Sequence, residues 1–110
     1  MAYTFDTALE NEYITVIHRD DDVGSYEFRV GQLETIVSLE IGRFISGNGT
    51  KFSLSHSMHT PRQAGPYRPS RTWEEDAPYA LYRAVASLTD YYLDAVKAGH
   101  TPEETWLVKN

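Results

Sequence analysis

The chain contains no cysteine, which excludes disulfide bonds, cysteine-ligated zinc sites, iron–sulfur clusters and thiol catalysis. Basic residues are also few, because 10 Lys and Arg stand against 16 Asp and Glu and give a net charge of −6. This balance is opposite to that of most nucleic-acid-binding proteins. No apolar run approaches the roughly 20 residues of a membrane span, and the N-terminus lacks the basic stretch of a signal peptide. We therefore expect a cytoplasmic protein without a membrane contact.

The chain length of 110 residues fits one domain, which we assign to residues 1–110. Hydrophobic residues make up 41% of the chain and are spread along it, so one core can form. We find no internal repeat, no low-complexity tract and no interdomain linker.

Four segments predict an antiparallel sheet because they are rich in β-branched and aromatic residues or alternate between apolar and polar residues. Two turns connect the later strands, a type II′ turn at Gly31-Gln32 and a glycine-rich turn within Ser46–Thr50. The alternation in the fourth strand places its serines on an outward, solvated face. The predicted strands are Glu12–His18, Ser25–Val30, Leu33–Ile41 and Lys51–Met58.

A long helix follows a proline-rich loop at Thr60–Arg71. Capping-box spacing from Thr72 to Glu75 and a proline at position 78 predict that it begins between Thr72 and Asp76, and Gly99 predicts its end. Its apolar stripe comprises Leu81, Ala84, Val85, Leu88, Tyr92, Ala95 and Val96, and its polar side comprises Arg83, Ser87, Asp90, Asp94 and Lys97.

The two ends of the chain are less regular. The first ten residues are compatible with an arm or with a single helical turn, and a short turn at Thr101–Glu104 would set Trp106 and Leu107 onto the body. Together these elements predict an α+β fold, in which a four-stranded antiparallel meander sheet is covered on one face by one long C-terminal helix.

No catalytic motif is present, so we assign no catalytic residue, no metal ligand and no cofactor. The four histidines lack metal-ligand spacing, and the serines of the fourth strand lie in no nucleophile motif. An enzyme would need a pocket that brings His18 or His56 together with a carboxylate.

Charge is segregated along the chain. Residues 51–73 carry a net charge of +4, while the rest carries −10. Arginine and tyrosine are enriched at interface hot spots, so the loop residues Arg62, Tyr67, Arg68 and Arg71 are candidate partner contacts. The alternative is an inert loop whose arginines pair with the protein's own acids.

The acidic residues offer a second candidate surface. Such a surface would imitate nucleic-acid phosphates and bind a basic groove of a partner, and a plain solvated face is the alternative. Tyrosines of the predicted helix, such as Tyr79 and Tyr82, either pack at the edge of the core or meet a partner. The candidate acids are Asp20, Asp21, Asp22, Glu27 and Glu34, and Glu40 of the third predicted strand belongs to the same surface.

In size, acidity, lack of cysteine and lack of an active-site motif, the chain resembles the small inhibitors encoded by phages and mobile elements, such as anti-CRISPR proteins. The resemblance is one of type, since no residue corresponds to a family motif. It implies a non-catalytic protein that occludes a charged surface of a nucleic-acid-handling complex. The alternative is a direct nucleic-acid-binding module that uses loop 61–71. Open strand edges also allow a homodimer.

Overall fold

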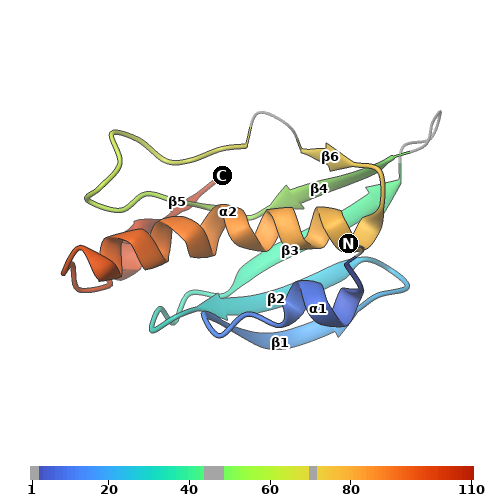
Figure 1. Ribbon diagram of the computed structural model, residues 1–110, viewed down its shortest axis with the longest axis horizontal. Helices are drawn as coiled ribbons and strands as arrows, with labels where there is room; N and C mark the ends of the chain where they lie inside the picture. The colour runs from blue at the N-terminus through green and yellow to red at the C-terminus, as the bar shows by residue number, and fades with distance from the viewer. Residues whose placement is uncertain (1–2, 44–48, 70–71) are drawn as a thin grey trace.

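An antiparallel sheet of five strands forms one layer of the protein, in the order β1-β2-β3-β4-β6. The computed structural model describes residues 3–43, 49–69 and 72–110 (Figure 1). The four long strands form the predicted meander, and the short strand β6 adds a fifth strand that the sequence did not predict. The strands are β1 (Ile14–Asp20), β2 (Ser25–Val30), β3 (Val37–Arg43), β4 (Thr50–Leu54) and β6 (Trp73–Glu74).

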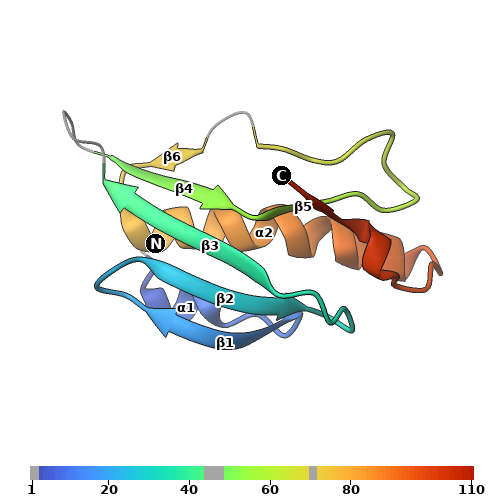
Figure 2. The same ribbon diagram turned by 180° about the vertical axis from the view of Figure 1, so that it is seen from behind.

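Helix α2 (Ala77–Lys97) covers one face of this sheet and leaves the other face open, as Figure 2 shows from behind. Its apolar stripe packs on Phe28 and Leu39, both fully buried on the inner sheet face. The predicted α+β architecture with one long C-terminal helix is confirmed. Two helix positions differ from the prediction, because Val96 is 38% exposed and Ser87 is buried. The Ser87 Oγ donates to the Ala84 carbonyl at 2.7 Å, which satisfies the hydroxyl.

The helix ends as its sequence predicts but begins at a different cap. Asp76 is the N-cap and accepts a hydrogen bond from the Tyr79 N–H at 2.8 Å. The predicted capping box at Thr72 is wrong, because the next two residues pair with β4 instead. Gly99 has a φ of +93°, and the backbone N–H groups of residues 99 and 100 close the last turn in a Schellman motif.

The predicted two-residue turn between the second and third strands is wrong. Residues 31–36 form a longer connection, and β3 begins at Val37 instead of Leu33. The carboxylate of Glu104 accepts hydrogen bonds from the N–H groups of Glu34 and Thr35 at 2.8 and 3.0 Å and from the Thr35 hydroxyl at 2.7 Å. These side-chain bonds replace the sheet pairing that the alternating sequence predicts.

The predicted fourth strand is interrupted at Ser55. Its second part, β5 (His56–Met58), leaves the main sheet and pairs with β7 (Leu107–Lys109) in a separate two-stranded sheet. The Ser55 hydroxyl accepts a hydrogen bond from the Ser38 N–H at 2.8 Å, which holds the break against β3. Ser57 is buried and donates to the Asn110 Oδ1 at 2.5 Å, so the expected solvated serine face is wrong at this position.

The remaining segments mostly follow the sequence. The first residues form the single turn α1 (Phe5–Leu9), and the short 3-10 helix η1 (Glu104–Trp106) buries Trp106 as predicted. Residues 60–69 form the predicted loop, which the bridge between Met58 and Tyr67 and a hydrogen bond from Gln63 to the Met58 carbonyl tie to β5. The predicted turn within Ser46–Thr50 lies mainly outside the described residues, although β3 and β4 pair on both sides of it. Over the described ranges, no helix has the length and apolar character needed to cross a bilayer.

Replacing Leu88 by alanine should lower the free energy of unfolding by about 2 to 5 kcal/mol, because it leaves a cavity between helix and sheet. Leu88 is only 1% exposed, whereas Val96 on the same helix is 38% exposed and provides a matched control. Urea unfolding of the two alanine variants measures the difference. Equal losses would contradict the helix register.

Replacing Glu104 by alanine should destabilise the protein by about 1 to 2 kcal/mol, because three hydrogen bonds to a carboxylate are lost. Amide exchange should become faster at Glu34 and Thr35. The neighbouring Glu103, which makes no capping bond through its side chain, provides the control as Glu103→Ala. Unchanged exchange at Glu34 and Thr35 in Glu104→Ala would show that the carboxylate does not hold the loop.

Candidate functional site

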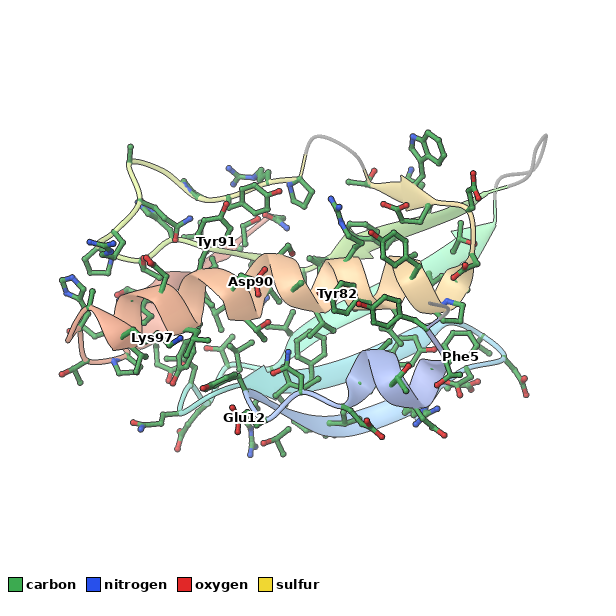
Figure 3. All side chains as sticks on the ribbon, viewed as in Figure 1. Phe5, Glu12, Tyr82, Asp90, Tyr91 and Lys97 are labelled. Atoms are coloured by element: carbon green, nitrogen blue, oxygen red, sulfur yellow. The ribbon has the colours of Figure 1, made fainter. Side chains whose placement is uncertain are left out.

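The outward side of helix α2 carries a second stripe of residues, opposite the apolar stripe that packs on the sheet. Tyr79, Tyr82, Ala86 and Asp90 recur at intervals of three and four residues, which places them on one helix face. Figure 3 shows the side chains along α2, with Tyr82, Asp90 and Tyr91 labelled. This stripe borders the proline-rich loop and β6, so three parts of the chain meet along it.

Tyrosine side chains from separate segments gather along this stripe. The ring of Tyr67 lies against that of Tyr91, with centroids 4.7 Å apart, and the Tyr67 N–H donates to the Met58 carbonyl at 3.0 Å. Near the N-terminal half of the helix, the Tyr3 ring stacks on Tyr82 with centroids 4.3 Å apart. Tyr79 extends this stack. Five of the eight tyrosines of the chain therefore lie on one surface.

A groove of about 420 Å³ lies between these tyrosines, which we call the tyrosine groove. Phe52 of β4 and Ala86 of α2 line it together with four of the tyrosines and with Pro69 of the loop. Each tyrosine has a broad apolar ring and a polar hydroxyl, so the groove can bury apolar surface and form hydrogen bonds. The residues that line the groove are Phe52, Tyr67, Pro69, Tyr79, Tyr82, Arg83, Ala86, Ser87, Asp90 and Tyr91.

Two charged side chains line the groove, and their surroundings differ. The Arg83 Nε lies 4.0 Å from a carboxylate oxygen of Glu74, which is buried. Asp90 is exposed. A hydrogen bond with Tyr3 raises the pKa of Tyr82, and the negative charge of Asp90 adds to this increase.

The structure separates the candidate contacts of the loop. Tyr67 lines the tyrosine groove, whereas the Arg62 Nε forms a salt bridge with Asp94 at 3.1 Å. Arg68 is exposed and lines a different hollow of about 310 Å³ together with Lys51. Arg71 lies outside the described residues. One arginine therefore pairs with the protein's own acid, and the described cations do not gather around Tyr67.

The candidate acids also do not form one patch. Asp20, Asp21 and Asp22 lie at the turn between β1 and β2, Glu27 lies on the open sheet face, and Glu34 lies in the connection at the other end of β2. A hydrogen-bonded salt bridge from Arg19 at 2.8 Å lowers the pKa of Asp21.

Two carboxylates of the turn between β1 and β2 also accept hydrogen bonds that stabilise its conformation. The Asp21 carboxylate accepts a hydrogen bond from the Tyr26 hydroxyl at 2.9 Å. The Asp20 carboxylate accepts bonds from the N–H groups of Asp22 and Val23. Two of the three aspartates therefore stabilise the turn, and Asp22 is the exposed one.

The histidines lie on different elements. Within residues 3–43, 49–69 and 72–110, no three His, Asp or Glu side chains are arranged to hold a metal ion. His56 Nδ1 lies 2.7 Å from the Ser55 Oγ, a contact between neighbouring residues at the strand break. His59 Nε2 lies 3.2 Å from the Gln63 carbonyl inside the loop. The nearest charged neighbour of His56 in the sheet register is Lys109, not a carboxylate.

Comparison of the chain with models of protein families, with curated proteins and with solved structures finds no match.

The sequence indicated Tyr67, Tyr79 and Tyr82 as candidate contacts, but it did not indicate that they line one groove. It placed Asp90 and Arg83 on a plain polar helix face and left Tyr3 unassigned. A second stripe at three- and four-residue spacing, with tyrosines instead of only charged residues, is the pattern that indicates this surface. The contribution of Tyr3 required the tertiary structure.

The stability of the protein should decrease as the pH falls below about 6.5. Burial lowers the pKa of His56, and the positive charge of Lys109 lowers it further. The unfolded chain then binds a proton at this position at a higher pH than the folded chain, so acidification favours unfolding. Urea unfolding between about pH 7.5 and 5.5 measures the decrease. The variant His56→Gln should show a smaller slope, and an unchanged slope would contradict this role.

Proposed function

We propose that the protein is a non-catalytic binding protein that attaches to a larger, basic nucleic-acid-handling protein complex and blocks one of its charged surfaces. The tyrosine groove is the observation that carries this proposal. Tyrosine provides large contact area with little side-chain entropy to lose, and it is enriched where binding energy concentrates. Five tyrosines on one surface of a small protein are therefore best explained by a contact with a partner.

The net charge supports a basic partner. A charge of −6 steers association toward positively charged surfaces, and nucleic-acid-handling proteins carry such surfaces where they bind phosphates. The protein would then act by occlusion, since a bound domain of this size covers part of the groove that a nucleic acid needs. The resemblance to phage-encoded inhibitors agrees with this mechanism, which would operate in the cytoplasm of the host cell.

Direct nucleic-acid binding through loop 61–71 receives less support from the geometry. Affinity for a phosphate backbone depends on unpaired cations, and Arg62 is paired with Asp94 while Arg68 lies at a different hollow from Tyr67. Stacking of bases on the tyrosines would still require such cations along the strand. This alternative is one outcome of the following experiment.

A pull-down from lysate of the native host tests the proposal, with the tagged protein as bait and with and without nuclease. We expect one nucleic-acid-handling protein complex to be retained after nuclease treatment. Tyr82→Ala, which removes a ring 36% exposed in the groove, should weaken this binding by about tenfold or more.

Val96→Ala is the matched control, because Val96 lies on the same helix with a similar exposure of 38% but does not line the groove. It should bind like the unmodified protein. Capture of nuclease-sensitive DNA or RNA alone would replace the proposal with direct nucleic-acid binding. Equal binding by both variants would show that the tyrosine groove is not the contact surface.

A further inference from the structure

The carboxylate of Asp90 is the unpaired charge of the tyrosine groove. It is exposed, and it has no hydrogen bond or ion pair within the part of the chain that the structure describes. Asp94, one helical turn further along, differs because its carboxylate forms a salt bridge with Arg62 at 3.1 Å. The two aspartates thus occupy neighbouring positions on α2, and only the one inside the groove is left for a partner.

The cation of the groove does not neutralise Asp90. The Arg83 Nε is directed at Glu74, 4.0 Å away, and the side chain of Glu74 is only 6% exposed. Arg83 therefore forms no ion pair with Asp90, and within the described residues the carboxylate of Asp90 has no cation as a direct partner. A positively charged group is therefore the complementary occupant.

The aromatic rings select the kind of cation. A guanidinium group is planar, stacks on the face of a tyrosine ring and binds a carboxylate through two parallel hydrogen bonds. The ammonium group of lysine is compact and strongly hydrated, so it gains less from a groove built of ring faces. Tyr67, Tyr82 and Tyr91 line the groove together with Asp90, and Tyr3 stacks on the ring of Tyr82.

We propose that the tyrosine groove accepts an arginine side chain of the partner protein, with the guanidinium group stacked on the tyrosine rings and hydrogen-bonded to Asp90. This inference rests on the proposed function and specifies its contact. The occupant follows from charge complementarity. An arginine supplies a positively charged partner for Asp90 and a planar group on which the tyrosine rings can stack.

An NMR titration with N-acetyl-arginine-N-methylamide tests the inference without the partner. We expect saturable shifts of the Tyr67, Tyr82 and Tyr91 resonances at millimolar concentrations of the probe. Asp90→Asn should weaken the binding at least about fivefold, because the charge-assisted hydrogen bonds are lost while the side-chain shape is kept. The control Asp22→Asn removes the same charge from an exposed aspartate outside the groove and should leave the affinity unchanged.

Three results would overturn the inference: equal affinity of the two asparagine variants, equal binding of the matching lysine probe, or shifts around Arg83 caused by inorganic phosphate. The last result would mark the groove as an anion site. The two proposals fail separately. If the probe does not bind but the capture of a complex still depends on Tyr82, only the proposal of an arginine in the groove fails. If the probe binds but no complex is captured, the proposed function fails.

Discussion

The burial of one stripe of helix α2 against the sheet is the constraint on which the other features depend. Leu81, Leu88 and Tyr92 are buried in the core that α2 forms with the sheet, which fixes the rotation of the helix about its axis. With 3.6 residues in each turn, this rotation turns Tyr79, Tyr82 and Asp90 away from the sheet. The core and the tyrosine groove are thus two faces of one helix, and any change that rotates the helix to repack the core also displaces the groove.

Local patterns predicted the elements that are stabilised by local periodicity. The alternation in Ser25–Val30 and the helical spacing from Leu81 to Ala95 correspond closely to β2 and α2. The predictions were wrong where a distant side chain takes the place of a regular partner. Glu104 holds the backbone before β3, and Ser55 turns the fourth strand away from the sheet. No pattern within a short window of sequence contains such contacts.

Less of the candidate site than of the fold could be predicted from the sequence, because the site also depends on contacts between residues that are distant in the chain. The composition of the loop drew attention to Tyr67, which does line the groove, because prolines and a tyrosine in a long loop indicate a contact surface. The pairing of Arg62 with Asp94 joins residues 32 positions apart, so the charge count of the loop overstated the cations available to a partner. Tyr3 stacks on Tyr82 of the groove because α1 packs beside α2.

The hydrogen bonds of Glu104 have a consequence for the order of folding. They join residues 69 and 70 positions apart. Strand β5 likewise pairs with β7, which lies at the C-terminal end of the chain. Loop closure over such distances costs entropy before any contact offsets it, so the meander and helix α2 should assemble before the connection at residues 31–36 becomes fixed. We therefore expect the segment from Glu104 to Asn110, which supplies the buried Trp106 and Leu107, to complete the core last. Until it docks, the N–H groups of Glu34 and Thr35 and the strand β5 lack these partners, and a slow final phase in refolding would correspond to its docking.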